Sequence, residues 1–276
     1  MTWWCAATNR DWSWAWRPYP GVWIFVLAIL AWYVWSLRSG SLLTAHGSPI
    51  APRAPRLASF VVGLALLWSC LDWPLGALGA GYLLSIHTTQ YVIITCVAIP
   101  LLVVGIPPEL RSRGRVSRFM AGPAAGLLGY TGIMAVTHIP SVSDTLMATQ
   151  VGSLVVDLAW ITGAVALWWP VLAPDGVVRI SPPLRVGYLF LATIPPTIPA
   201  AFMVFADYPL YATYELAPRV AGIAAGSDQQ SAGLIMKAGA DPLLWIAMAI
   251  VFFRWQRAED AAERQARPLS PQETAS

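Results

Sequence analysis

Residues 82–105 read YLLSIHTTQYVIITCVAIPLLVVG, a mostly apolar run without a single charged side chain. The hydrocarbon core of a bilayer is about 30 Å thick, and an α-helix needs about 20 apolar residues to cross it. A backbone surrounded by lipid must satisfy its own hydrogen bonds, which a helix does within one segment. The run is therefore predicted to be a transmembrane helix.

Six further apolar stretches approach or exceed that length along the chain. They run from Tyr19 to Leu37, Leu57 to Leu71, Phe119 to Thr137, Leu146 to Trp169, Leu184 to Phe205 and Gln229 to Trp255. Together with residues 82–105 they predict an all-α fold, a polytopic membrane helix bundle with seven transmembrane helices.

The composition agrees with this class of fold and argues against several others. Hydrophobic residues make up 57% of the 276 residues and charged residues only 11%, whereas soluble domains carry about 25% charged residues. The basic residues form no patch interleaved with aromatic side chains, so nucleic acid is not an expected partner. No nucleophile–base arrangement or phosphate-binding glycine loop stands out, so the protein is not expected to be an enzyme.

The chain divides into three predicted regions. Residues 1–17 are rich in tryptophan, which partitions to the headgroup level, and are predicted to be an interfacial lead-in lying on the membrane. Residues 18–256 form the seven-helix transmembrane domain. Residues 257–276 are charged and contain prolines, and are predicted to be a disordered tail.

The distribution of lysine and arginine predicts the orientation of the bundle. Thirteen of the 17 basic residues lie in the linkers after the first, third and fifth stretches or at the end of the seventh and beyond it. The other four are Arg10, Arg17, Arg219 and Lys237. Because basic residues accumulate on the cytoplasmic side, the N-terminus is expected outside and the C-terminus in the cytoplasm.

Two stretches contain residues that shape helices in lipid. They are Gly122, Gly126, Gly129 and Gly132 in the fourth stretch, and Pro195, Pro196 and Pro199 in the sixth. Small residues let helices approach closely, and proline kinks a helix and frees carbonyl groups. We interpret both sets as tight packing, with a cavity or hinge at the kink as the alternative.

Ionisable side chains within a membrane are costly and are candidate functional residues. In the predicted orientation His87 and His138 lie on neighbouring helices at the outer side, whereas His46 lies in a cytoplasmic linker. Imidazole binds copper in either oxidation state and thioether sulfur suits Cu(I). The two histidines, with Met134, Met147 or Met203 nearby, therefore predict a metal site. The alternative is that each histidine caps a helix or bonds a neighbouring carbonyl.

Asp157 lies near the middle of the fifth stretch, on the same helix face as Gln150. A carboxylate at that depth must be paired, neutral or hydrated. It is interpreted as a hydrogen-bond partner of a neighbouring helix, with a proton relay or a ligand as alternatives.

Several segments, in order, resemble the CtaG family of multi-span cytochrome c oxidase assembly proteins. The resemblance covers residues 60–255. Its elements are His87-Thr-Thr-Gln90 with Pro100 and Gly105-Ile-Pro107 in the third stretch, His138-Ile-Pro140 with Asp144, Trp168-Trp169-Pro170, Pro209-Leu210-Tyr211 with Tyr214, and Asp228-Gln229 followed by Gly233 and Met236.

The resemblance implies a multi-pass protein of the bacterial plasma membrane that helps to build an aa3-like oxidase of the respiratory chain. Its partners would be terminal oxidase subunits, and it would handle copper at the outer membrane face. The implied metal ligands are His87, His138, Met147 and Met236. The residues that would orient these ligands or relay protons are Gln90, Asp144, Asp157, Asp228 and Gln229.

The chain departs from the family pattern at three positions. Tyr91 stands where the family has a second histidine after the His-x-x-Gln motif, and Asp157 stands where a histidine is expected in the fifth helix. Lys237 replaces a tryptophan. The chain thus offers fewer histidines for a metal than the family pattern does.

Three other functions are each favoured by particular residues of the sequence. A haem b electron-transfer protein would use His87 and His138 as axial ligands. A retinal protein would use Lys237 in the seventh helix, but the third helix has no acidic counter-ion. A channel is suggested only by Asp157 and the kinked sixth helix.

Overall fold

The computed structural model describes residues 2–41, 54–111, 122–172 and 180–266, and every regular element in these ranges is a helix. Six helical runs within them are long and apolar enough to cross a membrane. They are Pro20–Ser39, Ala54–Leu71, Leu84–Gly105, Gln150–Leu172, Pro182–Phe205 and Ala225–Gln265. The prediction of an all-helical membrane bundle is confirmed.

The first half of the chain contains the helices α1 (Pro20–Ser41), α2 (Ala54–Leu71), α3 (Leu75–Gly81), α4 (Leu84–Ile93), η1 (Ile94–Ala98), α5 (Ile99–Gly105) and α6 (Pro108–Arg111). The element η1 is a π-helical turn that joins α4 and α5 into one run. This run is the stretch that the sequence singles out first.

The second half contains α8 (Pro123–Thr137), α9 (Pro140–Met147), α10 (Gln150–Leu172), α11 (Pro182–Ala192), α12 (Thr197–Phe205), α13 (Ala212–Glu215), α14 (Ala225–Leu234), η2 (Ile235–Gly239) and α15 (Ala240–Ala266). The element η2 is a second π-helical turn. The sixth predicted stretch is broken into α11 and α12 around Pro195 and Pro196, where proline cannot donate a backbone hydrogen bond.

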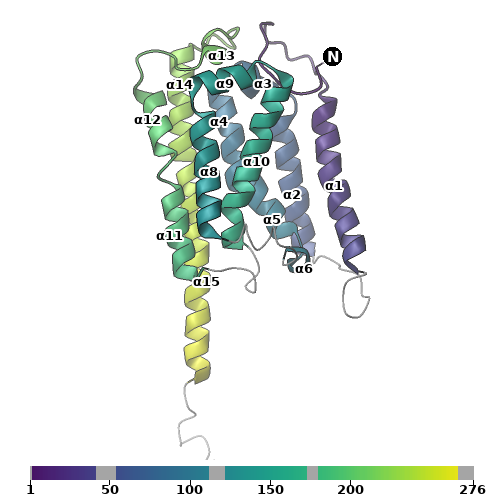
Figure 1. Ribbon diagram of the computed structural model, residues 1–276, viewed down its shortest axis with the longest axis vertical. Coiled ribbons are helices and arrows are strands. Elements are labelled where there is room, and N and C mark those ends of the chain that lie inside the picture. Colours follow the sequence, from purple (N-terminus) through teal and green to yellow (C-terminus); the bar gives the residue numbers. More distant parts are fainter. Residues whose placement is uncertain (1, 42–53, 112–121, 173–179, 267–276) are drawn as a thin grey trace, which may run out of the picture.

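Two boundaries differ from expectation. The fourth predicted stretch is α8, a shorter apolar helix of 15 residues, and residues 119–121 of that stretch lie outside the described residues. At the other end, α15 continues as a helix to Ala266 and projects beyond the bundle (Figure 1). The predicted tail therefore begins as helix, and residues 267–276 lie outside the described ranges.

The long helices run side by side, and short helices cover one end of the bundle. The pairs α8 with α10, α2 with α5, α12 with α14 and α11 with α15 are in contact. The short helices α3, α9 and α13 lie at the end where the N-terminus is found, and α6 lies at the opposite end (Figure 1).

The first residues of the tryptophan-rich segment enter the bundle. Trp4 and Cys5 are only 2% and 3% exposed, whereas Trp14 and Trp16 are 66% and 61% exposed. The Gln150 Oε1 atom accepts hydrogen bonds from the backbone N–H groups of Trp3 and Trp4, at 2.7 and 3.1 Å. The segment thus has a buried start and an exposed aromatic second half.

The glycines of α8 differ in how closely α10 approaches them. A Cβ atom added at Gly126 would lie 2.5 Å from the Ala166 carbonyl oxygen, whereas one added at Gly132 would meet nothing within 4 Å. We expect Gly126→Ala to destabilise the bundle by about 1–3 kcal/mol through overpacking. Gly132→Ala should be neutral or stabilising by up to about 1 kcal/mol, because alanine favours helix. Thermal unfolding in detergent compares the two, and equal melting temperatures would contradict the close α8–α10 contact.

Candidate functional site

A cavity of about 60 Å³ lies inside the bundle, with room for about four water molecules at ~15 Å³ each. Its wall includes four side chains of metal-binding types from four separate elements. They are His87 of α4, His138 at the end of α8, Met203 of α12 and Met236 of η2. Residues far apart in the sequence thus meet at one place.

The ring of His138 is held by its own helix. Its Nδ1 atom lies 2.8 Å from the Met134 carbonyl oxygen. Since a carbonyl only accepts hydrogen bonds, Nδ1 must carry the proton. The lone pair of the neutral ring is therefore on Nε2, the nitrogen left free to accept a proton or bind a metal.

The ring of His87 lies among aromatic side chains. It packs edge-on against Tyr91 with a centroid separation of 4.6 Å and tilted against Tyr214 at 5.8 Å. His87 lines the main cavity and also a second, smaller one of about 10 Å³. It therefore stands in the partition between the two.

The predicted ligand Met147 belongs to the smaller cavity. It is 1% exposed and faces that cavity together with Cys5 and Asp157, and it is not among the residues that line the main cavity. Met236, the other predicted thioether, lines the main cavity with Met203. The structure brings His87, His138 and Met236 together and leaves Met147 on the other side of the partition.

Tyr91 and Asp157, two residues at which the chain departs from the family pattern, are joined by a hydrogen bond. The Tyr91 hydroxyl donates a hydrogen bond of 2.7 Å to Asp157 Oδ1. The Trp4 Nε1–H donates one of 2.7 Å to Asp157 Oδ2. The carboxylate thus links α10 to α4 and to the N-terminal segment, which agrees with the interhelical hydrogen bond expected for it.

Asp228 and Gln229 fix the backbone beside the cavity. Asp228 accepts hydrogen bonds from the N–H groups of Leu84 and Ser85, at 2.6 and 3.2 Å, and from the Ser85 hydroxyl. It therefore caps the helix that carries His87. Gln229 accepts from the Leu210 N–H at 2.6 Å and donates to the Met203 carbonyl at 3.3 Å.

Gln90 and Asp144 likewise bond to backbone groups. The Gln90 amide donates to the Cys70 carbonyl of α2. Asp144 accepts from the N–H groups of Ala212 and Thr213, at 3.1 and 2.9 Å, at the start of α13. Both therefore join one element to another.

The wall of the cavity also contains residues that the sequence pattern did not single out. Thr95 and Cys96 of η1 and Tyr130 of α8 line it. The Thr95 hydroxyl is buried without a hydrogen-bond partner among the described residues. A π-helical turn has no simple sequence signal, although such turns are frequent at functional sites. Only the bundle shows that η1 and η2 both face this cavity.

The available donors fit one metal better than others. Within the described ranges no three His, Cys, Asp or Glu side chains gather closely enough to hold a metal. Two imidazoles, two thioethers and the Cys96 thiol remain, a soft set that suits Cu(I) and not hard cations that require oxygen ligands. The cavity is too small for a haem, since pockets for drug-sized ligands measure roughly 300–1,000 Å³.

The fold and the cavity define a multi-pass helical membrane protein with a histidine- and methionine-lined interior site. The family model described as cytochrome c oxidase caa3 assembly factor (Caa3_CtaG) matches residues 31–258, which is most of the chain. The chain belongs to this family, as the sequence resemblance implied. Comparisons with curated proteins and with solved structures each gave no match.

Proposed function

We propose that this protein assists assembly of a caa3-type cytochrome c oxidase by carrying Cu(I) in the main cavity. Copper is the cargo here, passed on to oxidase subunits, and not a resident cofactor. The observation that carries the proposal is that His87, His138, Met203 and Met236 line one cavity from four elements. The family supports the assembly role.

The donor chemistry supports Cu(I) as the cargo. Cu(I) is a soft ion that binds imidazole nitrogen and thioether sulfur. Neutral thioether and imidazole ligands leave the positive charge of the ion uncompensated by protein. We infer that such a site releases its ion more readily than a thiolate site, as a carrier requires.

The proposed topology has seven spans, with α8 as the fourth, the N-terminus outside and the protein in the bacterial plasma membrane. Arg38 lies in the last turn of α1, Arg111 is the last residue of α6 and Arg185 lies in the first turn of α11. The end of α1, the short helix α6 and the start of α11 lie at the end of the bundle away from α9 and α13 (Figure 1). This grouping and the positive-inside rule support the orientation. His138 directly follows α8 and precedes α9, which favours loading and release of copper at the outer face.

The alternatives receive less support from the side-chain arrangement. A haem does not fit the cavity volume. Lys237, the residue that a retinal protein would use, does not line the cavity and is ion-paired with Asp241.

The test is deletion of the gene followed by complementation. Membranes of the deletion strain are expected to show low oxidase activity and low copper content in the isolated oxidase, both restored by the wild-type gene. A His87→Ala/His138→Ala gene should fail to restore either at low copper, and added copper should partly replace it. A His46→Ala gene should complement fully. Normal, fully metallated oxidase in the deletion strain would refute the proposal.

A further inference from the structure

A break in the sixth span leaves a backbone carbonyl without its helical partner. In a continuous helix the Thr197 N–H would donate to the Thr193 carbonyl. Here it donates to the Ile194 carbonyl at 3.0 Å, because α11 ends at Ala192 and α12 begins only at Thr197. Thr193 is 6% exposed, and an unsatisfied carbonyl within a membrane is costly.

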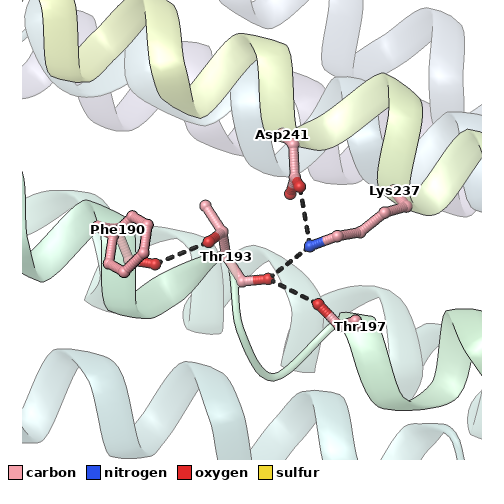
Figure 2. A network of polar contacts seen from close by, with 5 residues as sticks. All are labelled: Phe190, Thr193, Thr197, Lys237 and Asp241. Atoms are coloured by element: carbon pink, nitrogen blue, oxygen red, sulfur yellow. Dashed lines mark hydrogen bonds and ion pairs between the residues drawn. The ribbon is translucent and has the colours of Figure 1, made fainter.

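A charged side chain from the last span fills this position. Lys237 Nζ donates to the Thr193 carbonyl oxygen at 3.0 Å and forms an ion pair of 2.8 Å with Asp241 Oδ2 (Figure 2). The Thr197 hydroxyl also donates to the Thr193 carbonyl, at 3.2 Å. The amine thus has an anion from its own helix and a carbonyl from the neighbouring one.

The residues of this bridge alternate along the chain with residues of the cavity wall. Lys237 follows Met236, and Asp241 follows Ala240, and both Met236 and Ala240 line the cavity. Across the bridge, Pro196 precedes Thr197 and also lines the cavity. The bridge therefore joins the wall formed by η2 and α15 to the wall formed by the broken span.

An ion pair within a membrane span costs free energy, because both charged groups lose their hydration. Within an apolar span a lysine and an aspartate must each be compensated, and an apolar pair would cost less. Asp241 is 9% exposed, and Ala240, the residue before it, lines the cavity. The ion pair thus lies beside the cavity wall, and its lysine contacts the carbonyl at the break.

We propose that Lys237, held by Asp241, is a positioning residue that fixes the distance between Met203 and Met236 across the cavity. It acts by tying the Thr193 carbonyl at the break to the π-helical turn that carries Met236. The inference rests on the proposed Cu(I) function of that cavity.

The first test measures Cu(I) affinity by competition with a chromophoric Cu(I) chelator, using the purified full chain in detergent. Lys237→Met nearly keeps the length of the side chain but removes its charge. It is expected to weaken Cu(I) binding about 10-fold, as substitutions of residues that orient metal ligands do. Lys237→Arg should restore most of the affinity. The matched control is Arg219→Met, which removes another cation that donates to backbone carbonyls, those of Tyr214 and Glu215, and should leave the affinity unchanged.

A background without the two thioethers separates positioning from general stability. In a Met203→Leu/Met236→Leu protein, Lys237→Met should cause no further loss of Cu(I) affinity. An equal loss in both backgrounds, or an unchanged affinity in the wild-type background, would overturn the positioning role.

A second measurement tests the Lys237 bridge without using Cu(I). It remains informative if the wild-type protein binds no Cu(I), a result that would refute the proposed function itself. The three native cysteines are first replaced, and cysteines for spin labels are introduced at the exposed positions Ile198 and Leu234. The labels then report the distance between α12 and α14. Lys237→Met should shift or broaden this distance distribution, and Arg219→Met should not. An unchanged distribution in Lys237→Met would show that the bridge does not hold the two walls.

Discussion

Replacing His87 and His138 together by alanine is expected to weaken Cu(I) binding by more than about 100-fold. Substituting a residue that only orients a metal ligand weakens metal binding by about 10–100-fold, and the loss of two ligands should exceed this. The double variant removes both imidazoles that line the main cavity and leaves the thioethers of Met203 and Met236 with the Cys96 thiol. Competition with a chromophoric Cu(I) chelator measures the affinity and the number of ions bound.

Methionine variants serve as matched controls for this experiment. Met147 and Met236 are both buried, yet only Met236 lines the main cavity. Met236→Leu should therefore weaken binding, whereas Met147→Leu should leave it near the wild-type value. His46→Ala should also have no effect. If the double histidine variant kept the wild-type stoichiometry and affinity, the ligand assignment would be wrong.

Asp228→Ala is expected to be the most destabilising substitution near the cavity. The carboxylate is 3% exposed and accepts two backbone N–H groups at the start of α4 and the Ser85 hydroxyl. Hydrogen bonds to charged groups contribute about 1.5–3 kcal/mol each, and donors left buried without a partner add a penalty. For these three hydrogen bonds we expect a loss of at least about 4.5 kcal/mol, which corresponds to roughly 9–18 °C in melting temperature for a domain of this size.

Thermal unfolding of the detergent-solubilised protein tests this prediction. Asp207 is exposed in the same region, so Asp207→Ala is the matched control and should melt close to the wild type. Asp228→Asn keeps one acceptor oxygen and should lie between the two. A wild-type melting temperature for Asp228→Ala would show that the α4 cap contributes nothing to stability.

The sequence determined the class of fold because lipid leaves few choices. A mostly apolar run as long as residues 82–105 can cross the bilayer as a helix, which satisfies its backbone hydrogen bonds within one segment. The break between α11 and α12 lies at Pro195 and Pro196, where the sequence predicted a kink, because proline lacks the N–H that a continuous helix needs. His87 and His138 could also be singled out, because ionisable groups are rare in such runs.

The tertiary structure decided which of these residues share a site. Met147 and Met236 are equivalent in the sequence, but only Met236 lines the cavity that both histidines face. Two π-helical turns shift the phase of the helices, so simple helical spacing does not give the direction of Met236 or Thr95. Such contacts depend on helix rotation and crossing, which apolar periodicity alone does not fix.

Side-chain partners between distant segments also depended on the assembled bundle. Nothing local to Asp157 indicates that Trp4 and Tyr91 donate to it, and nothing local to Lys237 indicates that it donates to the Thr193 carbonyl. A polar group within a membrane must find a partner, and the sequence alone established that need. Only the packing of the helices determined which group meets it, because partner choice depends on which faces come together.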